Sequence, residues 1–268
     1  WLAAEVKAAM DVVGVERAFG FLKQTDWAAR AAAERRIKRK IQKILNEYLN
    51  KAETAVRRGQ EFDYAGMAEE LQAAIQPELA AMVVDTALGV SVDVGIGFDP
   101  TIINTHALGW SRRYTEGLIQ GLTETTRRQI DEVMTSFVQT PGMTQADLEK
   151  LLKPAFGPVR AEMIATTEVT RSYSEATSEI QQLVNQTGLQ MIRIWNTQND
   201  ELVCDLCGPL NGQPETEWAK YGADASGPPR HPRCRCGSTL TARPIEDIQA
   251  QAEELARQRE AYMAELVA

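Results

Sequence analysis

The sequence predicts an α+β fold: a mostly helical N-terminal region, then a small β-containing C-terminal domain, then a terminal helix. Two observations predict it. Before Gly188, long stretches space their apolar residues three and four apart, as amphipathic helices do. From Gly188 to Arg243 that period disappears, Pro, Gly and Asn become frequent, and all four cysteines occur. We therefore expect a helical region at 1–99, a second domain at 100–243 and a terminal helix at 244–268.

The first hundred residues are predicted to hold two helices, at 26–58 and 64–88. The first has an apolar stripe of Ile37, Ile41, Ile44, Tyr48, Ala52 and Ala55. Pro77 is expected to interrupt the second, because proline lacks the amide hydrogen that a helix interior needs. The Gly-containing segment 89–100 is expected to be a connector with a short strand.

Three more helices are expected before the helical period of the sequence ends at Gly188. A long helix starts at Pro100 or Ser111 and ends near Val138. A short helix follows the turn within 140–152, where Thr144 and Asp147 have capping-box spacing. The segment 153–158, KPAFGP, should break the chain before the next helix.

The remaining elements follow in order. A helix is predicted at 159–185, because its apolar residues fall on one face. The alternating segment 189–197 predicts one strand, and 238–243 predicts a second. Pro244 then begins the terminal helix.

Composition sets broad limits on function. The chain of 268 residues is 44% hydrophobic and 25% charged, as in soluble globular proteins with a core. Its net charge of −8 implies no general polyanion-binding surface. The longest apolar runs are broken within a few residues, so we expect no membrane span.

The cysteines lie in two short stretches, CDLC (204–207) and RHPRCRC (230–236). A C-x2-C turn directs two sulfurs at one centre, which suits tetrahedral zinc. The second stretch offers three ligands for the two remaining places. We therefore predict a structural Zn²⁺ held by four of these five residues: Cys204, Cys207, His231, Cys234 and Cys236. A metal would replace a core that this loop-rich region has few large apolar residues to build.

Other arrangements of the cysteines stay open at this stage. Two disulfides would form in an oxidising compartment, and four separate thiols would persist in a reducing one. A catalytic zinc would need an open position and a nearby base such as Asp200 or Asp205, which the spacing does not demand. The His-x-Glu element of zinc deaminases is absent before the C-x2-C.

Two charged features have both a structural and a functional interpretation. Glu168 lies near the apolar face of its helix, so it is either an active-site acid or, as we favour, a buried carboxylate paired with Arg160 or Arg171. The run RRIKRK is either a solvated helix face or a contact for packaged DNA. Its basic residues are Arg35, Arg36, Lys38, Arg39 and Lys40.

Three separated motifs carry a resemblance to a known family. They are RAEMIATTEVTRSYSEA (160–176), IRIWNTQNDELVCDLCGPLNGQ (192–213) and GPPRHPRCRC (227–236). In this order they resemble the C-terminal domain of tailed-phage minor head proteins, the Mu F-like head morphogenesis family. The resemblance covers about residues 100–245. One departure is Thr166, where the family pattern has arginine.

The resemblance implies a structural capsid protein of a tailed bacteriophage or prophage, without enzymatic activity. Such proteins act in head morphogenesis at the portal vertex, and their partners are the portal protein, other head proteins and, in some phages, the packaged DNA. We accordingly expect this protein in the virion and, during assembly, in the host cytoplasm. Arg160, Glu168, Trp195 and Asp200 are expected to be structural, with Trp195 and Asp200 bracing the first ligand pair.

Two rival functions make different structural demands. A metal-stabilised nuclease or toxin-like effector delivered with phage DNA would need a polar cleft joining Glu168, Asp200, His231 and Arg235. A zinc-stabilised DNA-binding module would depend on the basic run at 35–40.

Overall fold

The computed structural model describes residues 27–94, 99–140, 142–198, 200–242 and Arg257. This part of the chain is mostly helical and has one small two-stranded sheet, as predicted. The helices are α3 (Trp27–Arg58), α4 (Tyr64–Val94), α5 (Pro100–Gln139), α6 (Gln145–Phe156) and α7 (Pro158–Gln186). The strands are β1 (Met191–Asn196) and β2 (Gly237–Ala242), and two short 3₁₀ helices, η1 (Gly208–Leu210) and η2 (Trp218–Tyr221), lie between them.

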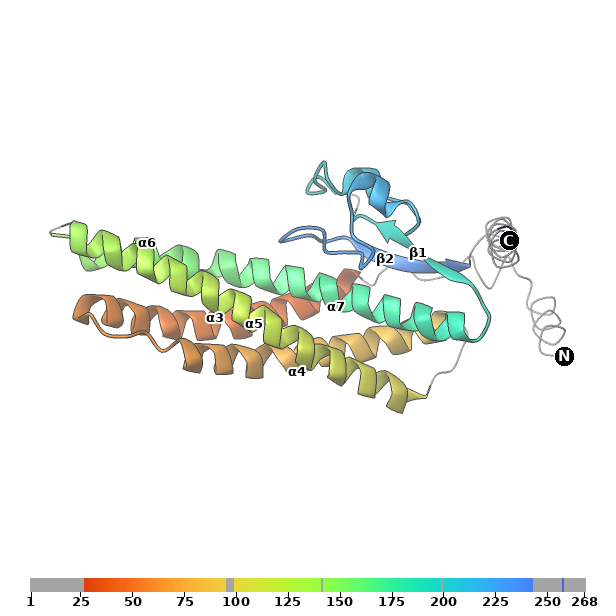
Figure 1. Ribbon diagram of the computed structural model, residues 1–268, viewed down its shortest axis with the longest axis horizontal. Coiled ribbons are helices and arrows are strands. Elements are labelled where there is room, and N and C mark those ends of the chain that lie inside the picture. The colour runs from red at the N-terminus through yellow and green to blue at the C-terminus, as the bar shows by residue number, and fades with distance from the viewer. Residues whose placement is uncertain (1–26, 95–98, 141, 199, 243–256, 258–268) are drawn as a thin grey trace, which may run out of the picture.

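The helices form an elongated bundle in which α3, α4, α5 and α7 run side by side and α6 covers one end (Figure 1). Their apolar stripes meet in one core that extends from Ala33 on α3 to Val169 on α7. The stripe predicted for α3 is buried at Ile37, Ile41 and Tyr48. Burial of such stripes is the main source of helix stability in proteins.

Two proline predictions are wrong. Pro77 lies inside α4, and the helix continues to Val94, so residues 89–94 are helical rather than a connector with a strand. Residues 95–98 lie outside the described part. Pro154 likewise lies inside α6. Buried neighbours such as Ile75, Leu79 and Phe156 fix each helix on both sides of its proline, which compensates for the lost hydrogen bond.

The break after α6 comes at Gly157 instead. Its backbone N–H donates to the Lys153 carbonyl at 2.7 Å. A Cβ at this position would lie 2.6 Å from that same oxygen, so only glycine fits without a shift. Pro158 then starts α7 at a position where a missing N–H costs nothing.

Helix starts follow the capping signals in the sequence. The Asp99 side chain accepts a hydrogen bond from the Thr101 N–H at 2.8 Å, so α5 begins at Pro100, the earlier of the two predicted starts. The predicted capping box of α6 is confirmed. The Thr144 hydroxyl accepts from the Asp147 N–H at 3.2 Å, and the Asp147 carboxylate accepts from the Thr144 N–H at 3.0 Å.

One helix in the described part passes a length and composition test for a membrane span, over Tyr64–Ser91. The expectation of no membrane span stays a prediction, because the core helix of a soluble protein passes the same test. The same helix packs against α3, α5 and α7, and its Met67, Leu71 and Ile75 lie in the bundle core.

The sheet lies against the C-terminal part of α7. The strands are antiparallel, with Met191 opposite Ala242 and Asn196 opposite Gly237. Met191 and Leu240 pack on Ile180 of α7 in a second core that also includes residues of α4 and α5. The long loop 197–236 joins the strands, and its last part lies along α7 (Figure 1).

The predicted terminal helix and domain boundaries are not tested by the described residues. The terminal helix at 244–268 lies outside the described residues, apart from Arg257. The division at residues 99 and 243 stays a prediction. Within the described part, helices on both sides of residue 99 share the first core.

Replacing the capping residue of α6 should destabilise the protein. We expect Thr144→Ala to lower the free energy of unfolding by about 1 kcal/mol, because the N–H of Asp147 loses its acceptor. Thr135→Ala is the matched control, since the Thr135 hydroxyl bonds only back to the Asp131 carbonyl within α5. Urea titration checks both variants, and an equal loss in both would contradict the capping role.

Candidate metal centre

The first ligand pair is presented by a tight turn that follows β1. The backbone N–H groups of Cys207 and Gly208 donate to the Cys204 carbonyl at 3.0 and 2.9 Å. This arrangement curls the C-x2-C segment so that both side chains lie on its inner side, and Gly208 begins η1.

The second stretch is a turn that leads directly into β2. The Cys234 N–H donates to the His231 carbonyl at 3.1 Å. Between them, Arg233 has a left-handed backbone with φ of 63°, which is uncommon for a residue other than glycine. Its N–H donates to the Thr167 hydroxyl of α7 at 2.9 Å and its guanidinium to the Val159 carbonyl at 3.2 Å, which hold this conformation in place.

The structure brings all five predicted ligands together. His231 Nε2 lies 3.2 Å from Cys204 Sγ and 3.3 Å from Cys207 Sγ. Cys207 Sγ lies 3.9 Å from Cys234 Sγ. Cys204, Cys207 and His231 form one close group, and Cys207, Cys234 and Cys236 form another, so Cys207 belongs to both.

The donor set fits a zinc ion in size and chemistry. A tetrahedral ion with Zn–S bonds of about 2.3 Å separates its sulfur ligands by just under 4 Å, close to the Cys207–Cys234 distance. The five side chains line a small cavity of about 20 Å³, which is room for one ion-sized particle. All four cysteines are free thiols, which leaves every sulfur available as a ligand.

The histidine is oriented for binding through one nitrogen. His231 Nδ1 lies 2.8 Å from the Pro232 carbonyl, which can accept its proton. That contact leaves Nε2, the atom facing Cys204 and Cys207, as the unprotonated ligand. The geometry is the one expected of a metal-binding histidine.

Hydrogen bonds within the cluster distribute the thiol protons unevenly. The bond between Cys207 and Cys234 raises the pKa of Cys207 and lowers that of Cys234. Burial acts to raise the pKa of Cys204, but hydrogen bonds from the backbone and side chain of Cys207 and from the Leu206 backbone, with the charge of His231, together leave this pKa below its ordinary value. Two sulfurs are thus predisposed to the thiolate form in which cysteine binds metals.

Asp200 and Trp195 lie beside the cysteine cluster, and their role in bracing the first ligand pair stays a prediction. Arg235 donates to both Asp200 oxygens at 2.6 Å, and Asp200 also accepts from the Leu202 N–H at 3.1 Å. Trp195 is fully buried and contacts Trp218 edge-to-face, with ring centroids 5.2 Å apart. These rings and three of the cysteines share a third buried cluster.

Glu168 is buried, and its contacts lie between helices of the bundle. It is 4% exposed and accepts a hydrogen bond from the Tyr114 hydroxyl at 2.6 Å, which joins α7 to α5. Burial raises the pKa of Glu168, while that hydrogen bond and the charge of Arg171 partly offset the effect. Arg171 lies over the Tyr114 ring and is therefore the arginine next to this carboxylate.

Arg160 has other partners. Its guanidinium donates to the Gln129 side chain at 3.1 Å and to the carbonyls of Ala155 and Leu122 at 2.9 and 3.0 Å. It therefore ties α7 to α5 and to the end of α6. Thr166, where the family pattern has arginine, lies 3.4 Å from the Glu34 carboxylate of α3.

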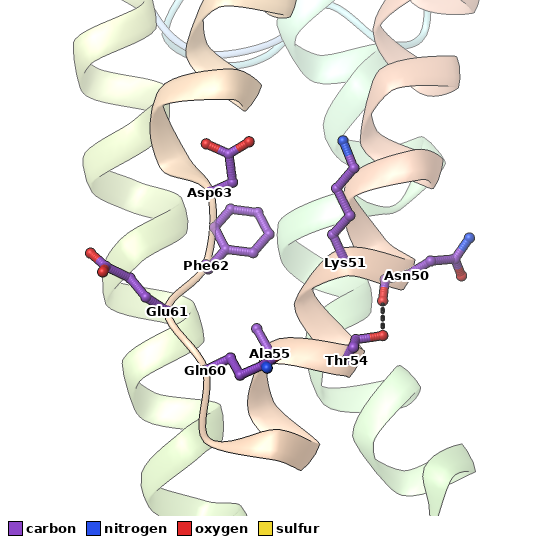
Figure 2. Close-up of a pocket in the computed structure, with 8 residues that line it drawn as sticks. All are labelled: Asn50, Lys51, Thr54, Ala55, Gln60, Glu61, Phe62 and Asp63. Carbon is purple, nitrogen blue, oxygen red and sulfur yellow. Dashed lines mark hydrogen bonds between the residues drawn. The ribbon is translucent and has the colours of Figure 1, made fainter.

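The four residues of the rival enzyme do not converge on one cleft. His231 and Arg235 line the cavity of the cysteine cluster. Asp200 is occupied by its two bonds to Arg235, and Glu168 faces Tyr114 between two helices. A larger hollow of about 390 Å³ lies at the connection from α3 to α4, where Asn50, Lys51, Phe62 and Asp63 are part of the lining (Figure 2). None of the predicted site residues lies there.

The basic run is partly neutralised within the bundle. Arg36 and Lys40 both pair with Glu78 of α4, at 2.6 and 2.7 Å, and Lys38 pairs with Glu162 of α7 at 2.5 Å. Arg35 and Arg39 are exposed. The run is therefore the solvated side of α3, opposite its buried isoleucines.

Comparison with known proteins agrees with these motifs. Residues 112–239 match the family model described as Phage Mu protein F like protein. The predicted resemblance to the Mu F-like family is confirmed. The matched segment contains most of α5, all of α6, α7 and β1, and every predicted metal ligand. It indicates a phage head-related structural protein. No curated protein and no solved structure gives a significant match.

Three residues beside the cysteine cluster were not predicted as part of the site, and of these Thr170 lies within the motif at 160–176. Arg30 of α3 and Thr170 of α7 contact the second ligand stretch, and Trp218 packs on Trp195. A signal for Arg30 was present. Extending the stripe of Ile41 and Ile37 backwards through Ala33 reaches Arg30, so a cation falls on the buried face.

Neutralising Glu168 should remove a pH-dependent loss of stability. The pKa of Glu168 is raised in the folded state. Its carboxyl group therefore favours folding most below the unfolded-state pKa of about 4.3, and this stability is lost as pH rises through the folded-state pKa. We expect Glu168→Gln to melt higher than the unaltered protein at pH 8, with a smaller difference near pH 4. Thermal melts across this range check it.

Glu149→Gln, at an exposed position on α6, is the matched control and should show no such trend. A Glu168→Gln protein that is less stable at pH 8 than at pH 4, relative to the unaltered chain, would contradict the assignment.

Proposed function

We propose that this protein is a structural minor head protein of a tailed phage or prophage. It acts in head morphogenesis at the portal vertex, with the portal protein and other head proteins as partners. The observation that supports the proposal most is the family match over residues 112–239, because it contains α6, α7, β1 and the cysteine cluster together. The protein resides in the virion, and in the host cytoplasm during assembly.

The fold supports a structural role. Long helices with one continuous core form a stiff rod, and the loop-rich region projects from one side of it near α7 (Figure 1). A rod with a projecting recognition region suits a protein that bridges neighbouring head components. Exposed apolar side chains on the projecting turn, Leu202 and Leu206, are 75% and 53% exposed and available for such contacts.

The cysteine cluster is proposed to hold one structural Zn²⁺. Cys204, Cys207 and Cys234 would supply thiolates, and His231 or Cys236 would complete the tetrahedron. The ion would supply no reaction chemistry here; it would fix the loop 197–236. Structural zinc contributes on the order of 10–16 kcal/mol in small metal-folded peptides, enough to order a loop with a small core.

A contact with packaged DNA is a secondary part of the proposal. It would use Arg35 and Arg39, the exposed members of the basic run that have no ion-pair partner among the described residues. Arg36, Lys38 and Lys40 already neutralise acidic groups of the bundle, so they would add little.

The assembly role predicts the location of the protein. Quantitative mass spectrometry of purified particles from a host that carries this gene should find it at low copy number beside the portal protein. Tail-less heads should retain it. Its absence from complete heads, with the portal protein present, would contradict a virion role.

The metal role predicts composition and stability. Protein purified under reducing conditions should carry about one zinc per chain, and a strong chelator should lower its melting temperature. Cys207→Ser should abolish stoichiometric zinc, because Cys207 belongs to both ligand groups. His106→Asn, at the only histidine outside the cluster, is the control and should retain it. Full stability without metal would refute the zinc centre.

A further inference from the structure

A buried guanidinium from the N-terminal part of the bundle reaches the cysteine cluster. Arg30 lies in the first turn of α3 and is 2% exposed. Its Nη1 donates to the carbonyl of Cys236 at 2.7 Å, and its Nη2 donates to the Thr170 hydroxyl. Arg30 therefore contacts a candidate ligand residue that is 206 positions away in the chain.

Thr170 extends this contact to a second ligand residue. Its hydroxyl lies 2.5 Å from the carbonyl of Cys234, so it can accept from Arg30 and donate to Cys234. Arg30 and Thr170 together hold the backbone of the second ligand stretch against α3 and α7. The rings of Trp27 and Tyr173 lie 5.3 and 5.8 Å from the guanidinium carbon and restrict its position.

The charge of Arg30 needs a counter-charge, because a buried cation without one is strongly destabilising. Glu34 supplies part of it: its carboxylate lies 3.6 Å from Arg30 Nε, but it is 24% exposed and also accepts from Thr166. A zinc ion bound by three or four thiolates has a net negative charge. Such a zinc centre next to Arg30 would supply the rest of the counter-charge.

We propose that Arg30 is a positioning residue that couples metal binding at the cysteine cluster to the attachment of α3. This inference rests on the proposed metal centre. Coupling between two events is reciprocal: if bound metal stabilises the position of Arg30, then removing Arg30 weakens metal binding by the same factor. Partners outside the ligand shell typically change metal affinity by about 10- to 100-fold.

The test is metal affinity, measured by competition with a coloured chelator at fixed pH on the full chain. We expect Arg30→Gln to weaken Zn²⁺ binding by about 10- to 100-fold. Thr170→Val, which keeps the shape of the side chain but removes the hydroxyl, should weaken it in the same direction. The absorption spectrum of the Co²⁺ form should keep its thiolate charge-transfer band in both variants, since the ligands themselves remain.

Arg160→Gln is the matched control. Arg160 is also buried, and its guanidinium donates to the Gln129 side chain and to the carbonyls of Ala155 and Leu122, all of which belong to the helical bundle. Its replacement should leave metal affinity unchanged even where it lowers the melting temperature.

Each outcome decides the proposal. Unchanged affinity in Arg30→Gln would overturn the proposal and leave the metal centre standing. An equal loss of affinity in the Arg160→Gln control would do the same. If Arg30→Gln does not fold, Thr170→Val decides in its place. If the unaltered chain binds no metal, the zinc centre fails and this coupling fails with it.

Discussion

The loop between β1 and β2 has a small apolar cluster of its own to fix it in space. Among the described residues of 197–236 the helices are two short 3₁₀ turns, and the buried cluster beneath them consists largely of two tryptophans and three cysteines. Ordering each residue costs about 1–2 kcal/mol of backbone entropy, which a cluster of this size does not offset by apolar burial alone. Convergence of five side chains that could bind a metal, at the base of the loop, is therefore the constraint on which we propose that its structure depends.

That constraint also explains how the two parts of the molecule are joined. The helices have a continuous apolar core and need no metal to pack. The loop attaches to them through the backbone of its ligand stretch: Arg233 bonds to α7, while Cys234 and Cys236 present their carbonyls to Thr170 and Arg30. The ligand turn thus faces the cavity with its side chains and the helices with its backbone. One segment serves both contacts.

Much of this architecture could be predicted from local sequence. Stripes at helical spacing, the Thr144 capping box and the segments 189–197 and 238–243 predicted the helices and strands, because they depend on neighbours a few residues apart. The convergence of the four cysteines and His231 could be predicted because C-x2-C spacing has a direct geometric meaning. The continuation of α4 through Pro77 could not, since it depends on burial against other helices. Arg30 and Thr170 also escaped prediction, because their partners are distant in sequence. The choice between His231 and Cys236 as the fourth ligand stays open.

The most direct test of the central claim is amide hydrogen exchange, followed by mass spectrometry, before and after metal is removed with a chelator. Peptides from residues 197–236 and from the first turn of α3 should lose protection, while peptides from the middle of α4 and α5 should keep theirs. Equal protection of the loop with and without metal would contradict the account, because its order would then depend on packing alone.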